Sequence, residues 1–421
     1  MINYVENLDY YRCDFFSRVL EKSTDIKNNT RNYILMHKDI DVAEICISLV
    51  SCEILDIIDV YDVKHLPIGV ITDNDGKVKL SSFNKWWLSR SKLHINGMRL
   101  NKILDFVNLD YVMDLVDKTC AMSLNDCYWL KPVNEKDYVY DDYEWSTKNF
   151  YDNEFSNDIL KFLNGYTFDK DEYIDVRTPN IIDMDDNGVW VYRNGDVYKI
   201  KKSQCKTGQD ISNELVANKF LDRLGGIEYV KYDLIDMNGE PAIESKVFVN
   251  PDVEFVSAHD IMKITDKPAN RSIYQHYIEC CKQLGYPIDK VKESINKMLI
   301  LDYIMVNSFR LKYDFGILRN SNSLEFVSVT PIDNNGFSLW YNSSISQIKL
   351  TEDAMLSCTF RGNHIDQIGL VEDLNWLDLD KLDGIVDECR EIFSSNEKLS
   401  DKRVNILCKV LEMQIENFKL V

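Results

Sequence analysis

The apolar positions along the chain alternate between a strand-like spacing and a helical spacing. Near the N-terminal end, Tyr33–Met36 and Asp41–Val50 are short and rich in β-branched residues, which is typical of strands. From Phe83 to Val116 the apolar residues recur at intervals of three and four, which predicts helices. Residues 31–130 are therefore expected to form a mixed α+β region.

A second mixed region is expected in the middle of the chain. Two alternating segments flank Asn194-Gly195, and this dipeptide is a strong signal for a two-residue hairpin turn. Helical spacing follows from Asp210 and ends at Gly225-Gly226. The predicted order is a hairpin, one helix and two strands, at residues 188–200, 210–224, 229–235 and 242–249.

After residue 260 the helical pattern dominates. Helices are expected at residues 273–284, 288–306, 381–393 and 401–418. One β-rich stretch from Phe315 to Trp340 interrupts them and carries several polar residues. The predicted fold class is α+β, with an N-terminal α+β region followed by two lobes, of which the C-terminal lobe is mainly helical.

The length of 421 residues exceeds what one compact core usually supports, so at least two packed parts are expected. An acidic, tyrosine-rich stretch between Asn134 and Lys170 is interpreted as a connector. The predicted division is an extension at 1–30, an N-terminal α+β domain at 31–165, a small lobe at 166–255 and a helical large lobe at 256–421.

The formal net charge is −20, with 69 Asp and Glu against 49 Lys and Arg. Such a charge repels the phosphate backbone of nucleic acid and the anionic surface of a membrane. Neither is therefore expected as a primary partner. A local basic pocket for a nucleotide remains compatible with this total.

Eleven cysteines are scattered along the chain with no CxxC pair and no Cys/His cluster at metal spacing. This usage is typical of reduced thiols. The N-terminal residues lack a basic stretch followed by an apolar one, and no apolar run is long enough to span a bilayer. A cytoplasmic location is expected.

Two polar stretches of the C-terminal region carry candidate chemistry. The first runs from Met298 to Arg319 and contains, at matching spacing, Asp302, Asn307, Arg310, Phe315 and Gly316. It resembles the catalytic loop of the HipA-like serine/threonine kinases, whose pattern is roughly D-x-x-x-x-N-x-D-R-H-x-x-N-F-G. The second, from Pro331 to Trp340, resembles the metal loop of that family, P-I-F-D-S-G-x-S-L-W.

Further segments resemble the same family. Lys199 fits the strand whose lysine holds nucleotide phosphates, and Glu214 fits the helix whose glutamate pairs with that lysine. Lys201, Lys202 and Lys206 are candidates to line a phosphate loop. Val247–Val256 resembles the connection between lobes. Four N-terminal segments, 33–39, 65–69, 86–90 and 122–129, resemble the leading region of HipA-domain proteins, and they are interpreted as core and turns.

The departures from the family pattern fall on the residues of the chemistry. The aspartate that accepts the substrate proton falls on Phe309, the next histidine on Leu311, and the metal-binding asparagine on Asp314. The metal-loop aspartate falls on Asn334, one position after Asp333. A phenyl ring accepts no proton, and an amide is a weaker magnesium ligand than a carboxylate.

The resemblance implies a kinase fold with ATP and magnesium as the family's ligands. Because these positions have changed together, we expect a pseudokinase that binds a protein or peptide partner. ATP is its candidate nucleotide ligand. One alternative is an active ATP-dependent transferase that uses the displaced carboxylates Asp314 and Asp333, with Asn334 as a further metal candidate. The other is a nucleotide-independent protein-binding module.

Overall fold

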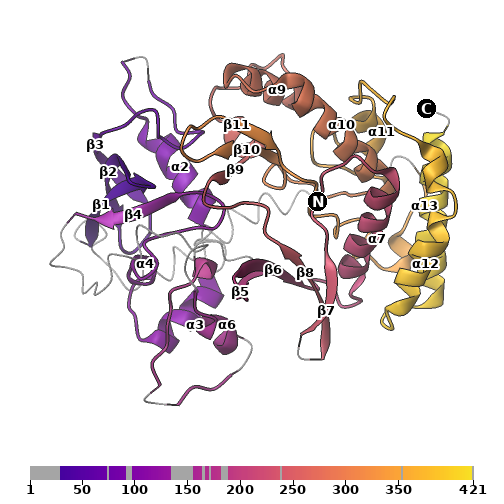
Figure 1. Cartoon of the computed structure of the whole chain (residues 1–421), viewed down its shortest axis with the longest axis horizontal. Helices are drawn as coiled ribbons and strands as arrows, with labels where there is room; N and C mark the ends of the chain where they lie inside the picture. The colour runs from indigo at the N-terminus through magenta and orange to yellow at the C-terminus, as the bar shows by residue number, and fades with distance from the viewer. Residues whose placement is uncertain are drawn as a thin grey trace. The chain divides into compact units, whose positions relative to one another are not determined.

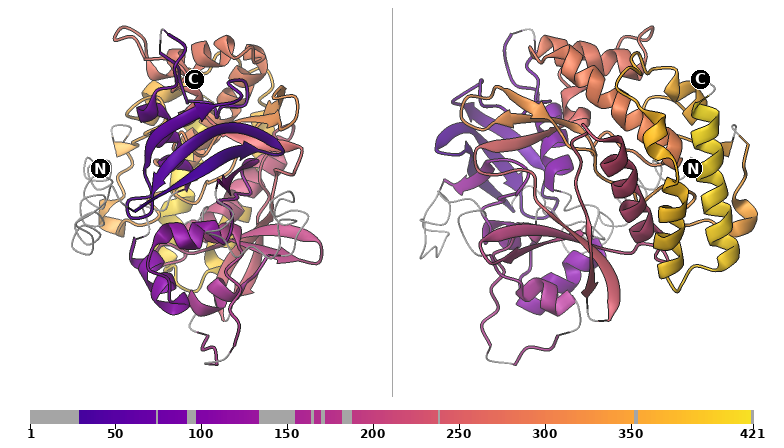
Figure 2. Two further views of the ribbon diagram at one scale, coloured as in Figure 1. Left: turned by 90° about the vertical axis from the view of Figure 1, so that its left-hand side faces the viewer. Right: turned by 45° about the vertical axis from the view of Figure 1, so that its right-hand side comes forward.

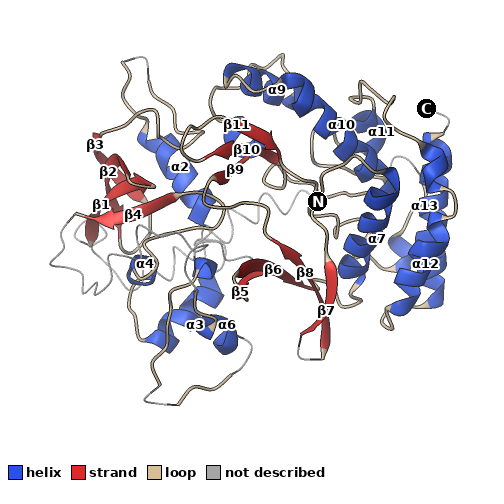
Figure 3. Ribbon diagram, in the orientation of Figure 1, coloured by secondary structure: helices blue, strands red, loops and turns tan. Residues whose placement is uncertain are grey.

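A computed structural model describes residues 29–73, 75–91, 97–133, 155–163, 166–169, 172–181, 188–237, 239–351 and 354–419. Mixed sheets and helices confirm the predicted α+β class (Figure 3). Most of the predicted extension and of the acidic connector lies outside the described residues, and so does the predicted boundary at residue 165. In the described part of the chain, no helix has the length and apolarity needed to cross a membrane.

The chain forms two compact units. The first combines residues 1–198 with the short segments 249–254 and 320–324, and the second contains the remainder. Strand β5 (Gly188–Arg193) belongs to the first unit. The reason is local, because the side-chain amide of Asn180 donates to the carbonyl of Trp190 at 2.9 Å and its oxygen accepts from the Trp190 N–H at 2.7 Å.

The first unit is built on a four-stranded antiparallel sheet (Figure 2, left). Its order is β3-β2-β1-β4, formed by Ile54–Val60, Ile40–Ser48, Thr30–His37 and Tyr128–Pro132. The sheet packs with α2 (Leu80–Ser91) into one core that includes the fully buried Phe83 and Trp87. Besides β5, this unit also contains α3 (Gly97–Val107), α4 (Val112–Asp117), α6 (Asp158–Leu163) and the short η2 (Pro179–Ile181).

The second unit begins with the predicted helix and strands. A sheet of order β5-β6-β8-β7 contains β6 (Asp196–Lys202), β8 (Glu240–Lys246) and β7 (Asp233–Met237), and the boundary between units falls inside β6. Helix α7 (Gln209–Leu224) begins after Gly208, whose φ of 68° is left-handed, and ends before Gly225. The hairpin turn is confirmed, since Asn194 and Gly195 both have positive φ.

Helices dominate the rest of the second unit, as predicted. They are α8 (Ala258–Ile261), α9 (Ile273–Gln283), α10 (Ile288–Met305), α11 (His364–Ile368), α12 (Ile385–Ser395) and α13 (Asp401–Phe418), with η3 (Ile345–Gln347) and η5 (Leu379–Leu382). Helix α12 lies between α7 and α13, and α13 also packs on α10 (Figure 1). The interrupting strands are β10 (Gly316–Asn320) and β11 (Phe326–Val329), in a sheet of order β11-β10-β9 with β9 (Val253–Ser257).

The backbone passes very close to itself where β10 starts. A Cβ at Gly316 would stand 2.0 Å from the carbonyl oxygen of Val256 and 3.0 Å from the nitrogen of Ala258. The Ala258 N–H also donates to the carbonyl of Phe315 at 2.8 Å. Only glycine allows this approach, which joins the end of the catalytic-loop segment to the start of α8.

We predict that Gly316→Ala destabilises the protein by about 3 kcal/mol, because the added methyl group must push two backbone segments apart. Urea unfolding of the two proteins measures the difference. Gly362→Ala is the matched control, since a Cβ there meets nothing within 4 Å. Equal losses in the two variants would contradict the close approach.

Candidate kinase-like site

Two polar loops meet in the second unit. Helix α10 ends at Met305, and Val306 takes a left-handed conformation that turns the chain into the loop from 307 to 315. The side-chain amide of Asn307 donates to the carbonyl of Asn334 at 3.3 Å, and Asn334 donates to Asp314 at 2.7 Å. The segments that resemble the catalytic loop and the metal loop therefore lie side by side.

Arg310 joins these loops from a fully buried position. Its guanidinium binds both carboxylate oxygens of Asp302, at 2.7 and 3.1 Å, and the side-chain oxygen of Asn335 at 2.7 Å. It also donates to the carbonyl of Asp333. Burial lowers the pKa of Arg310, but the charge and hydrogen bonds of Asp302 outweigh this effect and leave the pKa raised. Arg310 therefore keeps its charge, and its hydrogen bonds fix one loop on the other.

Phe309 directly precedes Arg310 in the loop. In the family pattern this position belongs to the proton acceptor. Its backbone N–H donates to the side chain of Asn307 at 3.2 Å. Its ring meets Phe337 edge to face, with 5.7 Å between centroids, and Phe337 lies 5.0 Å from Tyr341. Leu311 and Tyr313 in the same loop are 37% and 44% exposed. The loop thus presents aromatic and aliphatic surface.

The lysine that pairs with Glu214 is Lys201, at 3.7 Å. This corrects the expected pair of Lys199 and Glu214 by two residues. Lys199 and Lys201 point to the same face of β6, because side chains two apart in a strand do so. Lys199 still acts on the site, since its charge helps to lower the pKa of Asp333. Lys202 and Lys206 are exposed.

Lys201 is the cation around which the acidic residues gather. Its ammonium lies 3.2 Å from Asp333 Oδ1 and 2.5 Å from Asn334 Oδ1. Burial raises the pKa of Asp333, but Lys201 and then Lys199 lower it to about 2. Burial raises the pKa of Glu214 and of Asp314, against the opposing charges of Lys201 and Arg310 respectively.

The family resemblance implies magnesium, which is coordinated by oxygen ligands in octahedral geometry. The three candidate ligands are Asp314, Asp333 and Asn334. Asp314 accepts from the side chain of Asn334 and from the N–H of Leu311, both at 2.7 Å. Asp333 Oδ1 and Asn334 Oδ1 accept from Lys201. Within the described ranges, no three His, Cys, Asp or Glu residues form a metal-ligand group. In this arrangement the candidate residues do not fit a magnesium ion.

Sequence reasoning missed several residues that shape the site. The Tyr232 hydroxyl donates a hydrogen bond to Asp333, and the Tyr232 ring lies 4.5 Å from the Lys201 ammonium. Asn213 donates to the carbonyls of Gly336 and Ser338, at 2.9 and 2.8 Å. Asn213 directly precedes Glu214 in the sequence, and this position was an available signal. No local pattern pointed to Tyr232, because it contacts a residue a hundred positions away.

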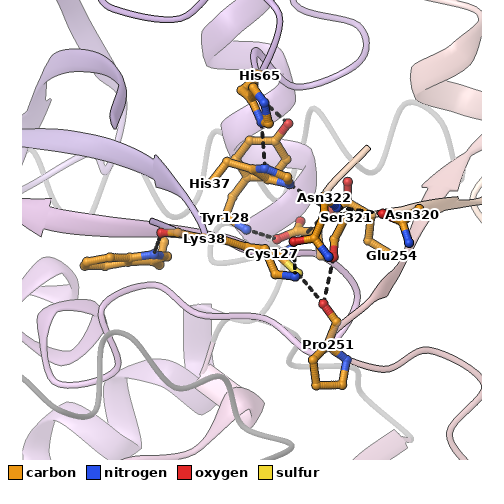
Figure 4. Close-up of polar contacts among 12 residues, drawn as sticks. His37, Lys38, His65, Cys127, Tyr128, Pro251, Glu254, Asn320, Ser321 and Asn322 are labelled. Carbon is orange, nitrogen blue, oxygen red and sulfur yellow. Dashed lines mark hydrogen bonds and ion pairs between the residues drawn. The ribbon is translucent and has the colours of Figure 1, made fainter. Parts of the chain in front are cut away.

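Three of the four N-terminal segments that resemble the family, 33–39, 65–69 and 122–129, come together in the first unit (Figure 4). His37 and His65 place their Nδ1 atoms 3.0 Å apart, and His37 Nε2 lies 3.2 Å from Glu254 Oε2. The N–H of Cys127 donates to the same glutamate oxygen at 3.2 Å, and the Tyr128 hydroxyl donates to the carbonyl of His65 at 2.9 Å. We name His37, His65 and Glu254 the histidine cluster.

The segment 86–90 and the segment that resembles the lobe connection complete this arrangement. Arg90 binds both oxygens of Asp126 at 2.7 and 2.8 Å and donates to the carbonyl of Tyr128. Glu254 comes from the segment 247–256 that resembles the connection between lobes. The three members of the histidine cluster are 0, 5 and 1% exposed. The motifs therefore form a buried polar network that holds the connecting segment on the sheet, beyond the expected role as core and turns.

Comparisons with known proteins add to this description. A scan against protein-family models gives no match, and a search of the curated proteins gives none either. Among solved structures, the chain is similar to the proinflammatory kinase CtkA of Helicobacter pylori, with a TM-score of 0.42 and 15% identity over 55% of this chain and 87% of that one. It is also similar to HipA of Shewanella oneidensis MR-1, determined with HipB and operator DNA, with a TM-score of 0.46 and 10% identity over 91% and 97% of the two chains.

We predict acid sensitivity from His364, a fully buried residue of α11 that faces Asp302. Burial lowers its pKa to about 4. An unfolded chain takes up the proton near pH 6.5, so stability is complete above that pH and falls as the pH drops from about 6.5 to about 4, by at most about 3 kcal/mol. Unfolding of His364→Gln between pH 7 and pH 4.5 should show a weaker loss than the unaltered protein. The same slope in both would contradict the assignment.

We also predict energetic coupling within the histidine cluster. A double-mutant cycle with His37→Asn and Glu254→Gln should give a coupling of about 1–3 kcal/mol, because both side chains are buried and in contact. Glutamine keeps the acceptor for Cys127. The neighbouring pair Lys38 and Asp252, at 3.7 Å and 26 and 71% exposed, is the control and should couple by less than about 0.5 kcal/mol. Additive effects in the buried pair would contradict the network.

Proposed function

We propose that this chain is a HipA-like kinase-fold protein that binds a protein or peptide partner and transfers no phosphate. The observation that carries the proposal is Phe309. In the family pattern its position corresponds to that of the base, and the ion pair beside it, between Arg310 and Asp302, is buried. The loop therefore keeps its shape while its proton acceptor is absent from that position, and phosphoryl transfer loses a group that orients the substrate hydroxyl.

The partner proposed is a segment with aromatic or aliphatic side chains. Phe309, Phe337 and Tyr341 form a continuous series of ring contacts, and the loop that carries Phe309 also carries the exposed Leu311 and Tyr313. Aromatic side chains supply much of the binding energy at protein interfaces.

Because the free cysteines of the described residues are mostly buried, we also propose a reducing, cytoplasmic setting.

ATP is proposed as a second ligand, and its phosphates would have to compete for Lys201 with Asp333 and Asn334. An active transferase is the second candidate function, and one observation favours it. Asp314 lies in the catalytic-loop segment, and burial raises its pKa, as suits a residue that accepts a proton. Binding of a partner without any nucleotide is the third outcome that the experiments distinguish.

Incubation of the full chain with γ-labelled and α-labelled ATP tests the proposal. We expect no label on the protein or on an added protein mixture. Label from either nucleotide that is abolished by Asp314→Ala or Asp333→Ala would overturn the pseudokinase reading and show that displaced carboxylates carry the chemistry.

We predict that Phe309→Asp with Asn334→Asp raises metal-dependent ATP turnover, since a proton acceptor and a carboxylate ligand return together. A general base contributes about 10²- to 10⁴-fold to such reactions, and a gain of that order would be visible with radiolabelled ATP. Phe309→Asn with Asn334→Asp is the matched control, because asparagine has the size of aspartate but accepts no proton. Equal turnover in the two double variants would show that Phe309 does not mark the base position.

A further inference from the structure

The family pattern and this chain carry the same two residue types at the metal positions, in exchanged order. Asparagine of the catalytic loop has become Asp314, and aspartate of the metal loop has become Asn334. The two side chains bind one another, with Asn334 Nδ2 donating to Asp314 Oδ1 at 2.7 Å. An amide placed this way presents its N–H₂ group to the carboxylate and its oxygen to the opposite side.

The opposite side is occupied by the Lys201 ammonium. It lies 2.5 Å from Asn334 Oδ1, 3.2 Å from Asp333 Oδ1 and 3.7 Å from Glu214 Oε1. An ammonium group has three N–H donors and a single positive charge. Three oxygens from the metal loop and from α7 thus surround one cation supplied by β6.

Four further oxygens of the two loops already accept hydrogen bonds from the protein. The carbonyl of Asp333 accepts from Arg310, and the carbonyl of Asn334 accepts from Asn307 at 3.3 Å. Both oxygens of Asp314 are used, by Asn334 and by the Leu311 N–H. A divalent ion would have to displace several of these bonds at once, and magnesium also gives up its own water reluctantly.

The surroundings hold the ammonium in place. The side chains of Lys201 and Asp333 are each 13% exposed, so water screens their attraction weakly. The ring of Tyr232 lies 4.5 Å from the ammonium, at a distance suited to a cation–π contact. A Cβ at Gly336 would stand 3.1 Å from the carbonyl of Asp210, so the glycine lets the metal loop lie this close to α7.

We propose that the ammonium of Lys201 is the resident cation of the two loops, and that the site takes a phosphate-bearing ligand as the metal-free anion. The first half is independent of the proposed function. The second half rests on the proposed binding of ATP. The charge of Lys201 then offsets the negative charge of the phosphates, as a divalent ion does in the family. Asp333 and Glu214 position the Lys201 ammonium.

The first experiment measures binding of Mn²⁺ to the full chain by electron paramagnetic resonance, together with thermal unfolding in EDTA and in millimolar MgCl₂ or MnCl₂. We expect no stoichiometric Mn²⁺ binding and no shift of the melting temperature. Lys201→Met removes the ammonium and leaves Asp333 and Glu214 without it, so this variant should gain a Mn²⁺ site and a metal-dependent rise of its melting temperature by several degrees.

Lys409→Met is the matched control, because it removes the same charge from an exposed position of α13. It should behave as the unaltered protein does. Stoichiometric Mn²⁺ binding by the unaltered protein would overturn the proposal, and so would a folded Lys201→Met variant that gains no metal response. If Lys201→Met does not fold, the titration of the unaltered protein decides alone.

The second experiment compares the melting temperature with ATP in EDTA and with ATP in MgCl₂. An equal rise in both supports binding of the metal-free anion. A rise only with MgCl₂ overturns this inference and leaves the proposed nucleotide binding intact. No rise in either condition removes ATP from the proposed function and overturns the second half of the inference, while the Mn²⁺ titration still decides the first half.

Discussion

The kinase-like site depends on the buried ion pair between Arg310 and Asp302. Both side chains are fully buried, and two charges without partners there would cost several kcal/mol. Arg310 uses its other donors on the carbonyl of Asp333 and the side chain of Asn335, so one guanidinium orders the end of α10, the loop after it and the metal-loop segment. The positions of Phe309, Asp314 and Asn334 follow from that arrangement.

The same ion pair explains why the two loops keep a fixed geometry. The residues that fix the loops are buried and hydrogen-bonded, whereas Phe309, Leu311 and Asp314, which depart from the family pattern, lie partly exposed. The acidic groups are satisfied from within, by Lys201, Asn334 and backbone N–H groups. The network that stabilises the loops therefore engages oxygens of Asp314, Asp333 and Asn334 that a metal would coordinate. This links the structural role of these residues to the proposed loss of phosphoryl transfer.

The first unit shows a second case of buried polar residues that join distant segments. The histidine cluster brings together the end of β1, the loop after β3 and the start of β9. Lys38, from the neighbouring turn, binds Asn322 at 2.8 Å, and Ser321 donates to the carbonyl of Pro251 at 2.7 Å. The two short segments 249–254 and 320–324, which the chain contributes to this unit from within the second, are thus held by specific hydrogen bonds.

The sequence by itself determined the order of helices and strands, since apolar spacing and turn residues such as Asn194-Gly195 act locally. It also located the two loops, because their motifs are short and continuous. Tertiary structure alone decided which residues meet. Strand periodicity cannot separate Lys199 from Lys201, which share a face of β6, and only the packing of α7 selects Lys201 for Glu214. Likewise Tyr232 reaches Asp333, and His37 reaches Glu254, across separations that leave no periodic signal, because such contacts are fixed by chain folding and not by local conformation.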